Sequence, residues 1–241
     1  MYNYRGKSED LMGRPSQNTD QRLIKAAVEL IPETGFSGLS LRKVAQKAGV
    51  NLGMFTYHFK NKEEFRQRVL QELYESFYAR LTLEVAKSGD PEEQLRHALT
   101  LVARYIRENR KLLLAIGRDV LEKDMLIIRF VEDNFYRHVL VLVDLIRKNR
   151  KSGKVQKNLS MPMILVFLIA NLAVPNMMAA VLERTPLGPK YDWLKKMFIP
   201  WVINDGAIAQ RLDLVLKALE PRVPAASTKK TAKVTVRKGK S

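Results

Sequence analysis

Hydrophobic positions along this chain recur at helical spacing from residue 19 to residue 219, and no segment shows a convincing strand alternation. Thr19 is the expected N-cap of the first helix, Pro32 should kink or end it, and Gly35 marks its stop. Further helices are expected at 61–87, 91–108, 110–122, 125–151, 161–184 and 190–219. The pattern therefore predicts an all-α fold.

The spacing between residues 40 and 59 predicts a helix-turn-helix. Ser40 can cap a short helix, Gly49 falls where a left-handed residue ends it, and Asn51 can cap the next helix, at 51–59. Phe55 and Phe59 are four residues apart and should share the buried face of this second helix. Its outward face would then carry aromatic, hydroxyl and imidazole groups, which suits a helix that lies in a DNA major groove.

Residues 19–65 resemble the DNA-binding domain of the TetR (tetracycline repressor) family. The resemblance is carried by GFSGLSL at 35–41, VAQKAGV at 44–50 and GMFTYHFKNKEEF at 53–65, and it covers about a fifth of the chain. It implies a homodimeric and usually repressing transcription factor that binds a palindromic operator on double-stranded DNA. Each subunit would have three N-terminal helices for DNA and a larger helical domain for an effector and for dimerisation.

Composition and resemblance together divide the chain into four regions. These are a flexible arm at 1–18, the DNA-binding domain at 19–79, the effector-binding and dimerisation domain at 80–220, and a basic disordered tail at 221–241. Carried over by position, the residues implied to contact DNA are Arg42, Lys43, Asn51, Leu52, Gly53, Thr56, Tyr57, His58 and Lys62. The family often has lysine or another polar residue at the position of Leu52, and tyrosine is common at the position of Thr56. Because of these two differences, the resemblance does not imply a particular operator sequence.

The family-like architecture assigns the dimer interface to 161–184 and 190–219. Apolar side chains at 112–116, 126–131, 139–143 and 161–178 would wall an effector pocket. Polar groups for the effector could come from Arg118, Asn134, Tyr136, Asn171 and Asn176. The effector is expected to be an apolar small molecule. Its binding would change the separation of the two recognition helices, with the helix at 61–87 as the hinge.

The net charge of +17 leaves an alternative open. The last 21 residues contain seven bases and no acid, and a basic patch attracts phosphate without reading sequence. The chain could therefore be a sequence-indifferent DNA-associated or membrane-surface protein that uses this tail. The apolar stretch 161–182 is long enough to span a bilayer, but Pro175 and Asn176 interrupt it, which favours a soluble helix without stable membrane insertion.

Several kinds of site are not indicated. The chain has no cysteine, and His97 and His138 have no partners at metal-ligand spacing, so we expect no metal site and interpret both histidines as structural or exposed. No nucleophile-base pair or glycine-rich phosphate loop occurs, so we expect neither catalysis nor a cofactor. The N-terminal residues lack the apolar stretch of a secretory signal, and the expected location is the cytoplasm.

Overall fold

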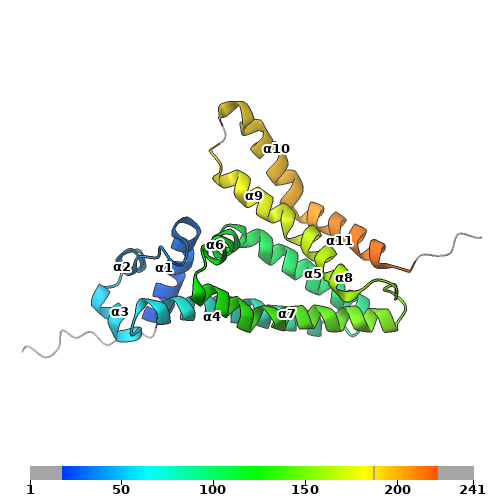
Figure 1. Ribbon diagram of the computed structural model, residues 1–241, viewed down its shortest axis with the longest axis horizontal. Helices are drawn as coiled ribbons and strands as arrows, with labels where there is room; N and C mark the ends of the chain where they lie inside the picture. Colours follow the sequence, from blue (N-terminus) through cyan, green and yellow to red (C-terminus); the bar gives the residue numbers. More distant parts are fainter. Residues whose placement is uncertain (1–17, 187, 222–241) are drawn as a thin grey trace, which may run out of the picture.

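The computed structural model describes residues 18–186 and 188–221, and within them the chain is all-α, as predicted (Figure 1). The expected arm and basic tail therefore lie almost wholly outside the described residues. The helices are α1 (Thr19–Thr34), α2 (Leu41–Ala48), α3 (Leu52–His58), α4 (Lys62–Ala86), α5 (Pro91–Glu108), α6 (Arg110–Leu121), α7 (Met125–Lys151), α8 (Met161–Leu172), α9 (Val174–Arg184), the short 3₁₀ turn η1 (Pro189–Tyr191), α10 (Asp192–Ile203) and α11 (Asp205–Leu219).

Short polar side chains begin the helices of the DNA-binding region. Oγ of Ser40 accepts a hydrogen bond from the backbone N–H of Lys43, and Oδ1 of Asn51 accepts one from Gly53 at 2.8 Å. Gly49 has φ 64° and ψ 37°, the left-handed conformation expected just after α2. These local groups fix where α2 ends and α3 begins, so the predicted helix-turn-helix is present.

The start and end of α1 differ from the expectation. Thr19 is not the N-cap but the first helical residue, and it is buried, while Asn18 precedes the helix. Pro32 does not end α1, which runs on to Thr34 because the proline sits in the last turn and removes only one N–H donor. The helix stops at Gly35, whose N–H donates to the Ile31 carbonyl at 2.8 Å.

Two helices expected to be long are each divided. The stretch 161–184 breaks at Ala173, two residues before Pro175, because the proline has no N–H to donate to the carbonyl four residues earlier. The stretch 190–219 breaks at Asn204, whose side chain accepts a hydrogen bond from the Ala207 N–H at 2.7 Å and so caps α11.

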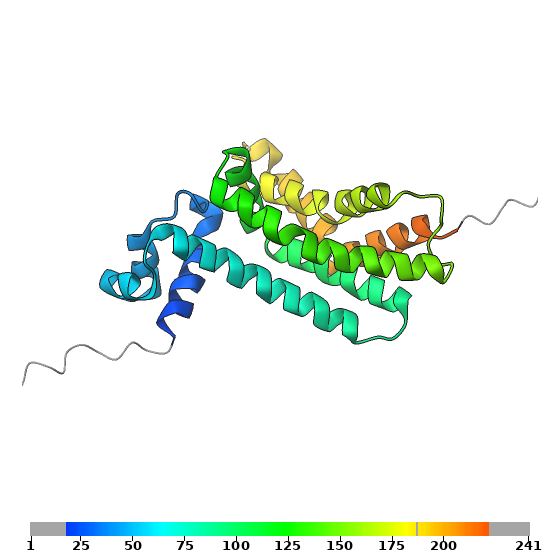
Figure 2. The same ribbon diagram turned by 60° about the horizontal axis from the view of Figure 1, so that its bottom comes forward.

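Two hydrophobic cores organise the molecule. The first joins α1, α2, α3 and the start of α4, and it also takes in Leu112 and Ala115 of α6 and Ile127 of α7. The second joins the rest of α4 with α5, α7, α8 and α11. Figure 2 shows α4 (cyan) and α7 (green) running along the molecule from the end that holds α1–α3. Because the first core reaches α6 and α7, the boundary at residue 79 stays a prediction.

Candidate functional site

Arg22 of α1 stabilises the turn between α2 and α3 through side-chain hydrogen bonds. Its Nη2 donates to the carbonyl oxygens of Ala48 at 2.6 Å and Gly49 at 3.1 Å. These carbonyls are the orphan acceptors at the C-terminal end of α2, where a cation is also favoured by the helix dipole. Nothing in the local sequence predicted this partner, which lies 26 residues before Ala48.

An aromatic cluster fixes which face of α3 points outward. Phe55 and Phe59 are buried, and their rings lie 5.0 and 4.8 Å from the ring of Phe65 in edge-on geometry. The opposite face is open to solvent, with Tyr57 71% exposed and Leu52 44% exposed. The predicted division into a buried and an outward face is therefore present.

Some polar groups of α3 are already used within the helix. Oγ1 of Thr56 donates to the Gly53 carbonyl at 2.8 Å, so its proton is not directed outward. His58 is half-buried, its Nε2 is buried without a hydrogen-bond partner, and its ring lies edge-on to Tyr57 at 5.3 Å. The structure thus places His58 behind Tyr57 rather than beside it on the open face.

The three basic residues implied to contact DNA have different environments. Arg42 and Lys43 are exposed in the first turn of α2. Lys62, at the start of α4, is half-buried, and its Nζ donates to the Ser37 carbonyl at 2.8 Å. Arg42 and Lys43 are free to approach phosphate, whereas Lys62 also ties α4 to the loop between α1 and α2.

A buried carboxyl group connects that loop to α6. Asp119 is fully buried, and its oxygens accept hydrogen bonds from the Phe36 N–H at 2.7 Å and the Ser37 hydroxyl at 3.1 Å. Gly35 has φ 73°, and a Cβ there would lie 2.7 Å from Oδ1 of Asp119, so only glycine fits. The segment just before α2 is therefore held directly by a helix outside the DNA-binding region.

An apolar pocket of about 440 Å³ lies between α4, α5, α6 and α7. Its walls are Leu70, Leu73, Tyr74, Phe77, Val102, Tyr105, Ile106, Leu112, Leu113, Ile116, Gly117, Val120, Phe130, Val131, Asn134, Phe135 and His138. We call this the α4–α7 pocket. The expected segments 112–116 and 126–131 contribute to it, but 139–143 and 161–178 do not. Its volume falls in the range of ~300–1,000 Å³ that suits small-molecule ligands.

Of the five polar residues expected to contact an effector, only Asn134 lines this pocket. Arg118 lies beside the Gly35 backbone and 3.8 Å from a carboxylate oxygen of Glu122, and Tyr136 is 55% exposed. Asn171 and Asn176 each donate to the carbonyl four positions earlier, that of Phe167 and that of Leu172, both in α8. Helical spacing alone did not show which face of each helix turns toward the pocket.

Tyr74, Tyr105 and His138 were not predicted to line the pocket. The Tyr74 hydroxyl donates to the Asn134 carbonyl at 2.6 Å and lies 3.3 Å from Nδ1 of His138. Burial lowers the pKa of His138 to about 4 and raises the pKa of Tyr105. At neutral pH the imidazole is therefore uncharged.

The pKa of His138 predicts a pH dependence of stability. The unfolded chain binds a proton at this histidine below its usual pKa of 6.5, whereas the folded chain resists it down to about 4. As the pH is lowered from 6.5 to 4, the free energy of unfolding should therefore decrease by up to about 3 kcal/mol. Urea denaturation at several pH values would measure this, and His138→Phe should flatten the slope over that window. An unchanged slope in the variant would contradict the assignment.

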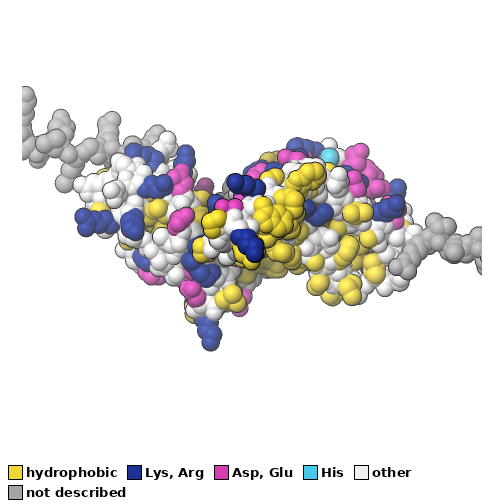
Figure 3. All heavy atoms as spheres, turned by 90° about the horizontal axis from the view of Figure 1, so that it is seen from above, with side chains coloured by type: hydrophobic (Ala, Val, Ile, Leu, Met, Phe, Trp, Pro, Cys, Tyr) yellow, Lys and Arg dark blue, Asp and Glu magenta, His cyan; other side chains and the backbone are white. Residues whose placement is uncertain are grey.

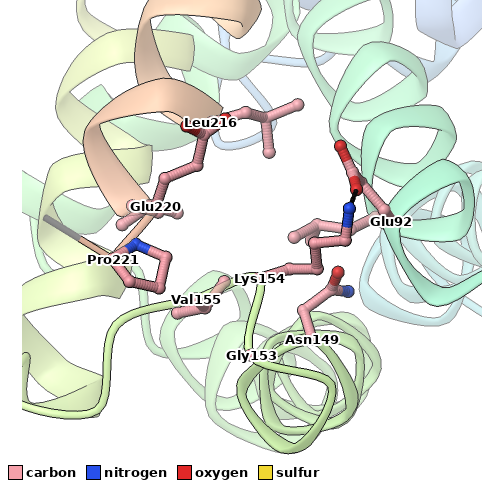
Figure 4. Close-up of a pocket in the computed structure, with 10 residues that line it drawn as sticks. Glu92, Asn149, Gly153, Lys154, Val155, Leu216, Glu220 and Pro221 are labelled. Carbon is pink, nitrogen blue, oxygen red and sulfur yellow. Dashed lines mark ion pairs between the residues drawn. The ribbon is translucent and has the colours of Figure 1, made fainter. Parts of the chain in front are cut away.

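A second cavity, of about 410 Å³, lies between α5, the α7–α8 loop and the end of α11 (Figure 4). The Lys154 ammonium and the Glu92 carboxylate, 3.0 Å apart, form an ion pair at one side of it. The side-chain amide of Asn149 donates hydrogen bonds to the carbonyls of Pro91 and Leu145. Because its polar groups satisfy one another, this cavity is a poorer ligand site than the α4–α7 pocket. In the described part of the chain, no cluster of three or more His, Asp or Glu residues could hold a metal.

The helices α8–α11 expose many large apolar side chains, visible in yellow in Figure 3. We call these the α8–α11 apolar surface: Met163, Val166, Ile169, Val174, Met178, Val181, Trp193, Met197, Trp201 and Leu214. By length and composition, Met161–Arg184 could also cross a membrane, although Ile164 and Leu168 pack into the second core. Exposed apolar area of this extent is typical of an interaction surface.

Comparison with known proteins identifies relatives that align with most of this chain. The family model described as "Bacterial regulatory proteins, tetR family" matches residues 23–69. The chain is 26% identical to the probable HTH-type transcriptional regulator YttP of Bacillus subtilis, over 75% of this chain and 88% of the relative. It is 22% identical to the HTH-type transcriptional repressor KstR2 of Mycolicibacterium smegmatis, over 66% of this chain and 78% of the relative.

Solved structures share the fold. The transcriptional regulator FadR from Bacillus subtilis, determined in complex with stearoyl-CoA, superposes with a TM-score of 0.63 and 17% identity, over 83% of this chain and 99% of that one. The ketosteroid transcriptional regulator KstR2 of Mycobacterium tuberculosis gives a TM-score of 0.61 with 20% identity, over 87% and 98%. The arrangement of an N-terminal helix-turn-helix on a larger helical body is common to these proteins.

Proposed function

We propose that this chain, a DNA-binding transcriptional regulator of the tetR family, is a homodimeric repressor. In the proposed mechanism it releases a palindromic operator when an effector enters the α4–α7 pocket. The observation that carries the proposal is the geometry of α3. A rigid aromatic anchor on one side leaves Tyr57 and its neighbours open on the other. Such a helix can enter a major groove without first unpacking the domain.

The proposed DNA contacts divide into two kinds. Groove contacts come from the open face of α3 and its cap, and phosphate contacts come from the bases around it. The groove set is Asn51, Leu52, Gly53, Thr56 and Tyr57, and the phosphate set is Arg42, Lys43 and Lys62. His58 supports Tyr57 from behind through the edge-on ring contact. With Thr56 bonded to its own helix, its methyl group and Leu52 suit an apolar contact such as a thymine methyl.

The α8–α11 apolar surface is the proposed dimer interface. Water would have to solvate large side chains such as Trp201, 77% exposed, if this surface stayed uncovered. A second copy of the same surface would cover it in a two-fold arrangement. The dimer would then present two α3 helices to successive major grooves, about 34 Å apart.

Helix α6 links effector and DNA in this mechanism. Leu112, Ile116 and Val120 wall the pocket, while Asp119 of the same helix binds the loop that leads into α2. An effector that favours a different position of α6 would thereby favour a different position of α2 and α3. Operator affinity would fall by the difference in effector binding between the two states, and DNA would weaken effector binding equally.

The chemistry of the pocket supports an apolar effector. Its walls are almost entirely aliphatic and aromatic side chains. One structural neighbour, FadR from Bacillus subtilis, was solved with stearoyl-CoA, and others are described as a ketosteroid transcriptional regulator and a fatty acid metabolism regulator. A regulator that binds chromosomal DNA acts in the cytoplasm, which is the location we propose.

Selection of bound sequences from random double-stranded DNA at physiological salt tests the proposal. We expect enrichment of a palindrome whose half-sites lie one helical turn, or a multiple of it, apart. The alternative, a basic protein that binds DNA or membranes without reading sequence, predicts no enriched sequence and binding that collapses with salt. Failure to enrich any sequence would exclude the operator-binding function.

Tyr57→Ala should lower specific operator affinity by about 1–3 kcal/mol, because the substitution removes the most exposed aromatic group of α3. Fluorescence anisotropy with the selected operator would measure the change. Tyr136→Ala is the matched control, since this tyrosine is also exposed but lies on α7, away from α3. If Tyr57→Ala bound the operator as tightly as the control, the groove assignment would be wrong.

A further inference from the structure

The walls of the α4–α7 pocket contain no lysine, arginine, aspartate or glutamate. The basic group nearest in the sequence to His138 is Arg137, whose Nη1 lies 2.5 Å from Oε1 of Glu75 and whose guanidinium stacks over the Tyr78 ring at 4.2 Å. This cation is already neutralised by a carboxylate. Because His138 is also uncharged at neutral pH, none of the side chains that line the pocket carries a charge.

The hydrogen bonds around His138 define its uncharged form. The Tyr74 hydroxyl has one proton, and it donates this proton to the Asn134 carbonyl at 2.6 Å. The 3.3 Å contact between the same hydroxyl and Nδ1 of His138 is therefore a hydrogen bond only if Nδ1 carries the imidazole proton. In this tautomer Nε2 has a lone pair and is a hydrogen-bond acceptor.

Tyr105 supplies the complementary group. Its ring packs on Phe77 with centroids 4.4 Å apart, and among the described residues its hydroxyl makes no hydrogen bond. Burial raises its pKa, so the hydroxyl keeps its proton at neutral pH and is a donor. The pocket walls thus carry an acceptor, Nε2 of His138, and a donor, the Tyr105 hydroxyl. The other polar side chains that line the pocket, Tyr74 and Asn134, donate to the carbonyls of Asn134 and Phe130.

We propose that the α4–α7 pocket selects an uncharged, largely apolar molecule that carries a hydroxyl group. This inference rests on the proposed function, in which the pocket holds the effector. A hydroxyl group donates one hydrogen bond and accepts others, so it matches both His138 and Tyr105. A carboxylate has no proton to donate to Nε2 and would find no cation on the pocket walls. It would also lose its hydration on entry.

Titration calorimetry on the full chain without DNA tests the selectivity. The probes are 1-octanol, octanoate and 1-fluorooctane at pH 7.5, which share one alkyl chain and differ in the terminal group. We expect 1-octanol to bind at least about tenfold more tightly than octanoate, because the carboxylate would be buried without a counter-charge. It should also bind about 3–10-fold more tightly than 1-fluorooctane, which has no proton to donate. Octanoate binding as tightly as 1-octanol, or no saturable binding of 1-octanol, would overturn the inference.

Variants locate the bound alcohol. Ile116→Trp should abolish binding by filling the pocket, and Tyr105→Phe and His138→Phe should each weaken 1-octanol about 3–10-fold while leaving 1-fluorooctane unchanged. Tyr136→Phe is the control outside the pocket. Arg80→Gln removes the exposed cation that lowers the pKa of Tyr105. If this variant lost octanoate binding but kept 1-octanol binding, Arg80 would be a binding partner of the carboxylate, which would contradict selectivity for an uncharged ligand.

The outcome is separable from that of the proposed function. If 1-octanol binds with the expected selectivity but does not release the selected operator, the repressor mechanism fails and the pocket assignment stands. If the operator is bound and released by other compounds while octanoate is preferred to 1-octanol, the repressor mechanism stands and the selectivity for an uncharged ligand fails.

Discussion

Val166→Glu is expected to convert the protein to a monomer and to lower operator affinity by at least about 100-fold. Two DNA-binding domains joined in one dimer bind a two-part site about 10²–10⁴-fold more tightly than either domain alone, so a monomer loses this gain. Analytical ultracentrifugation would give the oligomeric state, and anisotropy with the selected operator would give the affinity.

The choice of Val166 follows from its surroundings. It is 63% exposed on α8, between Met163 and Ile169, which are also exposed. A glutamate there remains solvated in the monomer, so the fold should be unaffected, but it would be buried without a partner when a second copy covers the surface. The substitution therefore acts on association and not on folding.

Leu83→Glu is the matched control. Leu83 is 67% exposed on α4, outside the α8–α11 apolar surface, so the variant has the same added charge at a similar exposure. We expect it to remain dimeric and to bind the operator normally. If Val166→Glu remained dimeric, or if both variants lost the dimer equally, the proposed interface would be wrong.

The sequence predicted features of the fold that depend on neighbouring residues. Ser40, Gly49 and Asn51 act within four residues of their own positions, and the turn between α2 and α3 could be placed for that reason. The break at Ala173 lies two residues before the predicted interruption at Pro175 and Asn176, whereas the break at Asn204 was not predicted. At Asn204 the signal was present, since asparagine is a favoured N-cap, but the apolar residues around it outweighed it.

Features that depend on distant partners were not predictable from spacing. Asp119 binds the Phe36 N–H across 83 positions, and no local pattern marks either end of that contact. The pocket depends on how α4 and α5 are rotated against α6 and α7, and so Tyr74 and Tyr105 were missed. The outward face of α3 was predictable because Phe55 within the helix and Phe59 directly after it fix its rotation locally.

Asp119→Ala is expected to lower the free energy of unfolding by about 3 kcal/mol and to weaken the response of operator binding to the effector. The Phe36 N–H would lose its acceptor inside the protein, and the loop before α2 would lose its attachment to α6. Movement of α6 could then no longer be passed to α2 through this contact. Urea denaturation measures the first effect, and operator titration with and without 1-octanol measures the second.

Two variants separate the roles of Asp119. Ser37→Ala removes only the 3.1 Å hydroxyl bond and should cost about 1 kcal/mol, while Asp133→Ala removes an exposed carboxylate and should change stability by less than about 0.5 kcal/mol. If Asp119→Ala lost stability but kept the full difference in operator affinity between the effector-free and effector-bound protein, Asp119 would hold the loop without transmitting the signal. The ion pair of Arg66 with Asp124, the hydrogen bond from Lys62 to the Ser37 carbonyl and the packing of α6 in the first core would then be the candidates for transmission.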